Sequence, residues 1–213
     1  MTDTTTTPTN ERPGSYHHGD LPSVLMAASA DLIAERGPHA FSLREVARRA
    51  GVSHAAPAHH FGSARGLLTA VATEGFELLE RALTEAYESD DDPREQLRRG
   101  GSAYVATALR YPGHYAVMFA DELHDPDDEP LVIAGCGAYE RLLECVERIR
   151  DQLNPDLDVE TAATMAWATM AGLVVLSPSL PNVAEQNDLT FRPIDELIER
   201  FTALFMDGFI HAR

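Results

Sequence analysis

Hydrophobic residues recur at intervals of about three to four positions along most of the chain, which is the spacing of one face of an α-helix. Glycine, proline and acidic clusters interrupt this periodicity, and the alternation expected of strands is scarce. The pattern therefore predicts an all-α protein of about nine helices. The predicted helices span residues 20–36, 42–50, 54–60, 64–88, 93–110, 114–121, 130–152, 159–176 and 194–210.

Two of these helices are short and are joined by a glycine turn. Ser42 and Glu45 match a capping box, in which the serine hydroxyl accepts a backbone N–H and the glutamate bonds back to the cap. Gly51 is expected to end the first helix in a left-handed conformation, and Ser53 to cap the second. Pro57 falls in the first turn of the second helix, where a missing N–H costs least. The segment predicts a helix-turn-helix, which places its second helix in the DNA major groove.

The flanking helices favour this interpretation over an ordinary pair of amphipathic helices. The preceding helix has Asp20 as its expected cap and ends at Gly37. A long helix follows over 64–88, and its apolar face contains Leu68, Val71, Leu79 and Leu83. Three packed helices with the third exposed would make a compact DNA-reading head.

The segment from Tyr16 to Leu83 resembles the N-terminal domain of the TetR (tetracycline repressor) family of bacterial regulators. The matching pieces are YHHGDL, AERGPHAFSLREVARRAGVS, HHF and LLTAVA. The resemblance implies that Ser42 and Arg44 contact phosphate and that Phe61 is a core residue. The candidate DNA-binding residues are Ser42, Arg44, Ser53, His54, Ala55, Pro57, His59, His60 and Arg65.

Two positions depart from the pattern of that family. Ala58 stands where the family usually has a tyrosine that touches phosphate, and Ala64 stands where it usually has a lysine. Two backbone anchors are therefore missing or moved. We expect weaker non-specific DNA affinity, or compensation by Arg65 and the histidines.

The charge is divided unevenly along the chain. All 17 basic residues are arginine, and they face 34 acidic residues, for a net charge of −17. Residues 1–65 hold six acids and six arginines, so the whole negative charge lies in the remainder. An acidic body would repel phosphate and orient the neutral head toward DNA. The acidity would equally serve solubility.

Six of the nine histidines lie within the first 65 residues, and His54, His59 and His60 lie on or beside the predicted recognition helix. Imidazole ordinarily titrates at about pH 6.5, so we expect DNA affinity to rise as the pH falls through that value. A metal site is disfavoured, because the adjacent histidine pairs lack a cysteine or carboxylate cluster to complete a ligand shell. No metal and no cofactor are expected.

The C-terminal half more loosely resembles that of a TetR subgroup with a Trp, a His and a Gly in the penultimate helix. Trp167 and Gly172 match, and Ala171 replaces the histidine. Aromatic and thioether side chains predict an effector pocket for an apolar or aromatic molecule, because no arginine or lysine is placed to hold an acid. The candidate ligand contacts are Tyr104, Tyr111, Tyr115, Met118, Phe119, Met165, Trp167 and Met170, most of which would also suit an ordinary core.

The last two helices are the best candidates for self-association, because small residues on one meet an apolar stripe on the other. A monomer could also bury that stripe internally. The resemblance implies a homodimer through a four-helix bundle, and symmetric operators require two heads. The candidate dimer contacts are Ala163, Ala166, Leu197, Phe201 and Phe205.

The expected organisation is a disordered arm (1–15), a helix-turn-helix domain (16–65) and an effector and dimerisation domain (66–213). No signal peptide is recognised and no apolar run approaches a membrane span, so we expect no membrane partner and a cytoplasmic protein. Cys136 and Cys145 would be about 13 Å apart on one helix, too far for a disulfide. Phosphate loops and hydrolase or zinc motifs are not found, which argues against an enzyme.

Together these features predict a transcription regulator that binds a palindromic double-stranded DNA operator and is released by a small-molecule effector. Repression is the commoner outcome in the family that the chain resembles. A helical adaptor that uses the same fold for protein contacts is the alternative, since Ala58 and Ala64 remove two DNA anchors.

Overall fold

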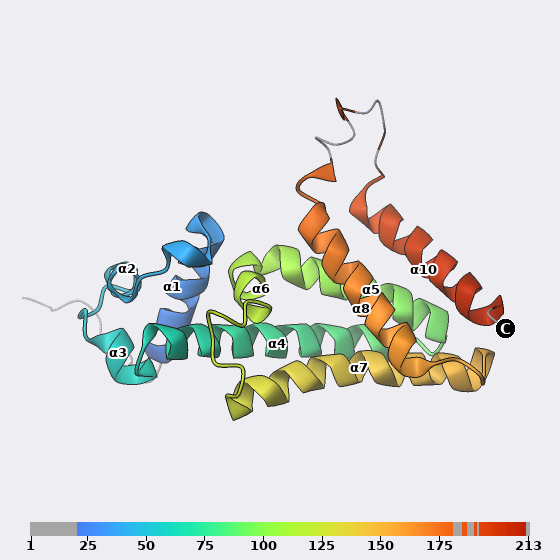
Figure 1. Ribbon diagram of the computed structural model, residues 1–213, viewed down its shortest axis with the longest axis horizontal. Coiled ribbons are helices and arrows are strands. Elements are labelled where there is room, and N and C mark those ends of the chain that lie inside the picture. The colour runs from blue at the N-terminus through green and yellow to red at the C-terminus, as the bar shows by residue number, and fades with distance from the viewer. Residues whose placement is uncertain (1–20, 181–184, 187–189, 191, 212–213) are drawn as a thin grey trace, which may run out of the picture.

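The computed structural model of the chain describes residues 21–180, 185–186, 190 and 192–211, and every regular element within them is a helix (Figure 1). The predicted all-α class is therefore confirmed, whereas the expected cap Asp20 lies outside the described residues. In chain order the elements are α1 (Leu21–Arg36), the 3-10 helix η1 (Pro38–Ala40), α2 (Leu43–Arg49), α3 (Ala56–Phe61), α4 (Ala64–Glu88), α5 (Pro93–Arg110), α6 (Pro112–Met118), α7 (Glu129–Leu153), α8 (Val159–Leu176) and α10 (Ile194–His211).

The helix bounds follow the predicted ranges along most of the chain, and α6 is the main exception. It spans Pro112–Met118 instead of the predicted 114–121. Proline suits the first turn of a helix, where its missing N–H has no partner to lose. Pro112 therefore begins a helix at the point where the sequence analysis expected only a break.

The N-terminal helices, which we call the head (α1 to α3 with the start of α4), enclose a small apolar cluster. Val52 and Phe61 are half-buried and pack against it, the latter as the resemblance implies. Gly51 has φ of 67°, which confirms the left-handed turn predicted after α2, and Gly37 also has a positive φ, of 77°, where α1 ends as predicted. The buried members of the cluster are Leu25, Ala30, Leu32, Val46, Ala50, Leu67 and Val71.

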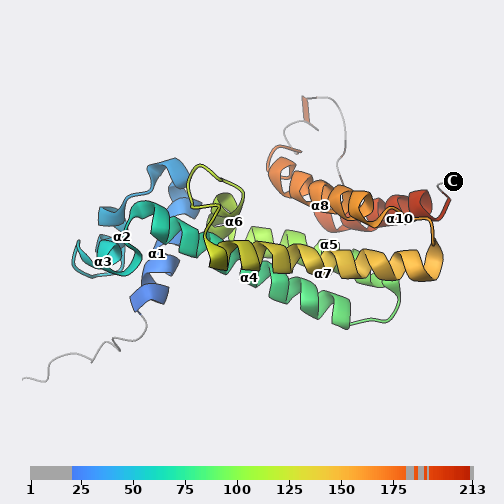
Figure 2. The same ribbon diagram turned by 60° about the horizontal axis from the view of Figure 1, so that its bottom comes forward.

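The long helix α4 continues from the head into a larger cluster, which we call the body (α5 to α10 with the rest of α4). α7 and α5 both pack along α4, and α8 and α10 both pack against α5 (Figures 1 and 2). One stripe of α4 supplies much of this core, at the spacing of a buried helix face. Its members are Leu68, Ala72, Phe76, Leu79, Leu83 and Tyr87.

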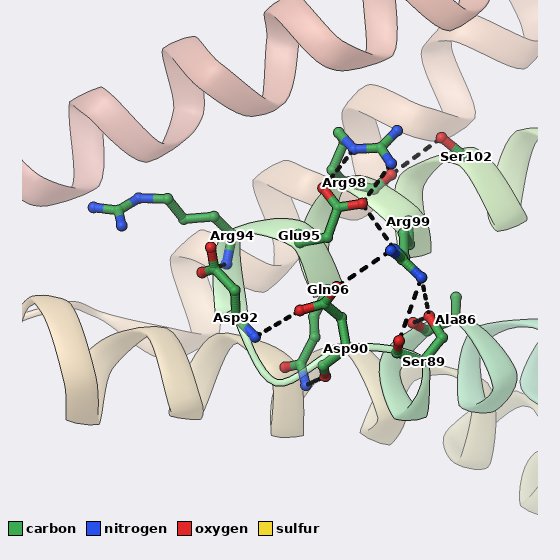
Figure 3. Close-up of polar contacts among 10 residues, drawn as sticks. All are labelled: Ala86, Ser89, Asp90, Asp92, Arg94, Glu95, Gln96, Arg98, Arg99 and Ser102. Carbon is green, nitrogen blue, oxygen red and sulfur yellow. Dashed lines mark hydrogen bonds and ion pairs between the residues drawn. The ribbon is translucent and has the colours of Figure 1, made fainter.

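A polar network fixes the corner between α4 and α5 (Figure 3). Asp92 caps α5 by accepting a backbone N–H of the first turn at 3.0 Å. Arg99 donates to Ser89 Oγ at 2.9 Å and to Asp90 Oδ2 at 3.2 Å. Gln96 Nε2 donates to the Asp90 carbonyl at 2.6 Å. These contacts tie the end of one helix to the start of the next, so α4 and α5 form a fixed antiparallel hairpin.

The head meets the body where α1 crosses α6. Gly113 approaches α1 so closely that a Cβ on this residue would lie 1.9 Å from the Ala30 carbonyl oxygen. Beside this contact, His114 Nε2 of α6 lies 3.0 Å from Glu74 Oε2 of α4. The position of the head therefore depends on a contact between backbones that leaves no room for a side chain.

We expect Gly113→Ala to destabilise the protein by about 1–3 kcal/mol, because the added methyl group must push α1 away from α6. Urea denaturation followed by circular dichroism measures the loss.

The matched control is Gly135→Ala in α7, where a Cβ would meet Phe76 at an ordinary 3.9 Å. Replacing this helical glycine should stabilise the protein by about 0.5–1 kcal/mol. Equal unfolding midpoints for the two variants would contradict the close contact.

Candidate nucleic-acid interface and interior cavity

The capping box predicted at the start of α2 is wrong. Ser42 is the N-cap residue, but its side chain makes no capping hydrogen bond. Glu45 is engaged by Arg48 instead, whose Nε and Nη2 donate to the carboxylate at 2.9 Å and 2.8 Å. A bidentate, charge-assisted pair is stronger than a bond to a neutral backbone N–H, so the carboxylate turns toward the arginine.

The recognition helix α3 also begins differently from the prediction. Its first residue is Ala56 rather than His54, and Ala55 is its N-cap residue. Ser53 contributes its carbonyl oxygen, which accepts the Ala56 N–H at 3.0 Å, and not its side chain. The ring of Pro57 crowds the carbonyl four residues earlier, which keeps Ser53 out of the helix.

α3 presents most of its side chains to solvent. The exposed candidate DNA contacts are Ser42, Arg44, Ser53, His54, Ala55, His59, His60 and Arg65. Pro57 is instead fully buried, so the expectation that it lies on the DNA-facing surface is wrong. Its ring anchors α3 to the head. Ala58 and Ala64, the two departures from the family pattern, are both exposed.

The turn that ends α3 was not predicted from the sequence. Gly62 has φ of 71° and reverses the chain, and Ser63 Oγ then caps α4 by accepting the Gly66 N–H at 3.0 Å. A Cβ on Gly66 would lie 2.2 Å from the Phe61 carbonyl oxygen. The pair Gly62-Ser63 is a recognisable signal, because glycine often ends one helix and serine often caps the next.

The arginines of the head fall into two groups. Arg48 and Arg49 are held by carboxylates, the latter by Glu35 at 2.9 Å and by Glu45 at 3.4 Å. In contrast, the guanidinium groups of Arg44 and Arg65 are exposed and make no ion pair with any described residue. They lie in the first turns of α2 and α4, and these are the two free positive charges beside α3.

Two narrow cavities occupy the body. The first has a water-accessible volume of about 30 Å³, and no charged side chain lines it. The second holds about 10 Å³. These spaces admit a water or two, so any larger ligand requires the helices to separate. The first is lined by Leu83, Tyr87, Leu97, Gly100, Gly101, Tyr104, Leu142, Ala166, Trp167, Met170, Phe201 and Thr202.

The cavities contain six of the eight predicted effector contacts. Tyr104, Trp167 and Met170 line the first cavity, and Tyr104 also lines the second. The other contacts that line the second cavity are Tyr111, Tyr115 and Met118. Phe119 and Met165 line neither cavity and are 48% and 53% exposed. Tyr87 was not predicted, although its spacing from Leu83 on α4 signals a buried position.

The lining of the first cavity is aromatic and neutral. The Tyr104 hydroxyl lies 3.2 Å from the Tyr115 hydroxyl, and its ring meets Trp167 edge-on at 5.3 Å. Burial raises the pKa of Tyr87 and Tyr104 well above the ordinary range, so both phenols stay protonated. The cavity can therefore offer hydrogen bonds and ring faces, but no counter-ion.

The predicted dimer contacts lie mostly inside the single chain. Ala163, Ala166 and Phe205 are buried, and Leu197 and Phe201 are half-buried. Among the side chains that the structure describes, the large apolar ones that α8 and α10 expose are Met165, Val175, Leu176 and Leu204.

α8 is also long and apolar enough to span a membrane, with a mean hydropathy of 1.5 over 18 residues, contrary to the sequence analysis. Length and composition alone do not identify a span, and α8 packs against α5 and α7.

The remaining titratable side chains do not form a metal or disulfide site among the described residues. Cys136 is exposed and Cys145 is buried on the same helix α7, and both are free thiols. Burial raises the pKa of Cys145 to about 12, so this thiol stays protonated. Groups of three or more histidine, cysteine, aspartate or glutamate side chains that could hold a metal are absent from the described part of the chain.

Two family models match the chain. Residues 25–71 match "Bacterial regulatory proteins, tetR family", and residues 97–205 match "Tetracyclin repressor-like, C-terminal domain". The transcriptional activator FasR of Mycolicibacterium smegmatis is 28% identical over 172 residues, which are 81% of this chain and 74% of FasR. The transcriptional repressor Rv3405c of Mycobacterium tuberculosis is 26% identical over 188 residues, 88% and 89% of the two chains.

A solved structure shares the fold of this chain. A protein of unknown function from Rhodococcus sp. RHA1 has a TM-score of 0.78 and 31% sequence identity, over 94% of this chain and all of the other.

The ion pairs of Glu45 make one prediction about pH. Hydrogen bonds from Arg48 lower the pKa of Glu45 from 4.5 to about 2. A depressed folded-state pKa gives stability that is present above the unfolded value and is lost as the pH falls toward the folded one. Glu45→Gln should therefore lose less stability than the wild type between about pH 5 and pH 2.

Urea denaturation at several pH values measures the difference. The matched control is Glu77→Gln, which removes an exposed carboxylate of α4 that makes no ion pair with a described residue. A Glu45→Gln profile that parallels the wild type down to the lowest pH would show that the ion pairs contribute nothing.

Proposed function

Because the chain belongs to the TetR family of transcriptional regulators, we propose that it binds a palindromic DNA operator as a homodimer and releases it when a small effector enters the body. The single observation that carries the proposal is the exposed surface of α3, flanked by two arginines that pair with no carboxylate of the described residues. We further propose that it acts as a cytoplasmic repressor, by occupying a promoter that polymerase would otherwise use.

The surface of α3 has the shape and chemistry that the major groove requires. Ala55 and Ala58 are small, so the helix backbone can approach the base edges closely. His54 and His59 are exposed and can donate hydrogen bonds to bases or phosphate. The exposed arginines at either side, Arg44 and Arg65, would hold the phosphate backbone and fix the register of the helix.

The acidic body supports this orientation. Residues 66–213 contain 28 acids and 11 arginines, while residues 1–65 are neutral overall. A body of this charge is repelled by DNA, so an encounter is productive only through the head. The two arginines and the histidines would then compensate for the lysine and tyrosine that Ala64 and Ala58 replace.

The exposed apolar residues of α8 and α10 support a dimer. Val175 and Leu204 are 69% and 72% exposed, which is unfavourable for large apolar side chains unless a partner covers them. Two copies that each contribute α8 and α10 would form a four-helix bundle and place two heads at successive turns of DNA. The small residues predicted at the interface, Ala163 and Ala166, would act indirectly by packing α8 onto its own chain.

The interior cavity supports a neutral effector. Its lining offers aromatic rings, a thioether and tyrosine hydroxyls, and this suits an apolar or aromatic molecule. An effector that spreads the helices to enter would move α4, which lines the cavity at Leu83 and Tyr87 and carries the head at its other end. A coupling of about 1–3 kcal/mol, roughly 5–150-fold in DNA affinity, would suffice for such a switch.

We expect Arg44→Ala and Arg65→Ala to weaken binding to all DNA sequences alike. Each variant should also lose about one phosphate contact. The slope of log affinity against log salt should therefore become less steep by about 0.9. Fluorescence anisotropy with DNA selected from random fragments measures both effects.

The control is Arg48→Ala, which removes a guanidinium that Glu45 already engages and should change the salt slope little. His59→Ala and Ala55→Ser should instead alter the preference among sequences. Salt-independent binding, or no effect of any of these changes, would favour a protein-interaction adaptor.

The dimer makes a separate prediction. Val175→Glu combined with Leu204→Glu should yield a folded monomer with at least about tenfold weaker operator binding, because two charges cannot be buried without partners. Analytical ultracentrifugation measures the mass. Glu199→Gln, at an exposed position of α10, is the control, and a dimer that survives the double change would exclude this interface.

A further inference from the structure

An open groove of about 540 Å³ runs along the outer surface between α4 and α5. Each helix contributes residues at intervals of three or four, so the groove follows the axes of the hairpin. It shares no lining residue with the first cavity, whereas Thr107 and Tyr111 line both the groove and the second cavity. Its lining consists of Leu78, Arg81, Ala82, Glu85, Ala86, Ala103, Ala106, Thr107, Arg110 and Tyr111.

The middle of the groove is smooth and its length is limited. Four alanines line it, two from each helix, so a flat apolar group can lie close to both backbones. The lining stretch of α4, from Leu78 to Ala86, measures about 12 Å at about 1.5 Å per residue. The corner network of Asp90, Gln96 and Arg99 fixes the hairpin beyond Ala86, so the groove does not depend on a ligand for its shape (Figure 3).

Two arginines lie at the same end of the groove. The hairpin is antiparallel, so the early part of the α4 stretch, at Arg81, faces the late part of the α5 stretch, at Arg110. Both side chains are exposed and neither makes an ion pair with a described residue, in a chain with twice as many acids as arginines. The Arg110 guanidinium lies over the Tyr111 ring at 5.4 Å, which holds it at the groove. Glu85, the one carboxylate of the lining, lies one turn farther along α4.

We propose that this groove binds an amphipathic organic anion, whose acid group pairs with Arg81 and Arg110 and whose apolar chain lies on the alanines. The length of the groove favours a small molecule over a partner helix. Two helical turns would bury far less than the roughly 1,000 Å² that a specific protein interface needs. A medium-length alkyl carboxylate matches both the length and the charge, and the site is separate from the proposed DNA-binding surface and from the first cavity.

The test uses octanoate as the probe and titration calorimetry of the full chain as the readout. Octanoate should bind, octanol should bind at least about tenfold more weakly, and the double variant Arg81→Gln/Arg110→Gln should weaken octanoate by about tenfold. The matched control is Arg94→Gln, which removes an exposed arginine of α5 outside the groove whose guanidinium also makes no ion pair within the described part of the chain (Figure 3).

A second pair of variants tests whether the alanines that line the groove contact the ligand. Ala106→Leu fills the groove and should abolish octanoate binding, whereas Ala116→Leu at an exposed position of α6 should leave it unchanged. Octanoate binding that survives both the arginine and the alanine changes would place the ligand in the interior cavity and overturn the proposal. Equal affinity for octanol and octanoate, or no binding of either, would overturn it as well.

Discussion

The structure depends on one helix that belongs to two hydrophobic clusters. α4 buries Leu67 and Val71 in the head and Leu79, Leu83 and Tyr87 in the body, so neither cluster is complete without it. The polar network at the α4–α5 corner fixes the C-terminal end of α4 to α5. The close contact of α6 with α1 fixes the head beside the N-terminal part of α4. A rigid rod between two packed clusters transmits displacement at one end to the other, because close-packed interiors do not absorb strain locally. The geometry of the body thereby sets the geometry of the head.

The sequence was most informative where local rules and tertiary packing agree. The bounds of α5 and α8 were predicted because apolar periodicity, acidic caps and nearby prolines coincide there, and those of α4 followed from its apolar periodicity. The left-handed turn at Gly51 followed from its position alone. Most residues of α3 were predicted to be exposed, because so short a helix can pack only one face against the rest of the head. In these regions the local conformational preference of each residue matches the fold, so one sequence is enough to predict the helices.

The errors concern competition between partners and the direction of single side chains. Spacing could suggest the capping role of Glu45, but not that Arg48 and Arg49 would engage its carboxylate. Phe119 and Met165 have the chemistry of a pocket wall, yet both are about half exposed. The ring of Phe119 packs edge-on against Phe76 and Tyr115 without lining either cavity. Tyr87 enters the cavity from a helix that the pocket prediction had not included. The partner of a carboxylate and the direction of a side chain depend on which helices meet across long sequence separations. Local sequence patterns do not specify these contacts.

The burial of Pro57 has a consequence for how this head could evolve. A proline that serves only as an internal anchor fixes α3 without taking part in recognition, so stability and base preference are assigned to different residues of the same short helix. Ala55, Ala58 and His59 are exposed, and the ring of His59 contacts that of its exposed neighbour His60. Substitutions there could redirect the protein to new promoters while the scaffold beneath remains untouched, and such separation favours rapid divergence of target genes among duplicated copies.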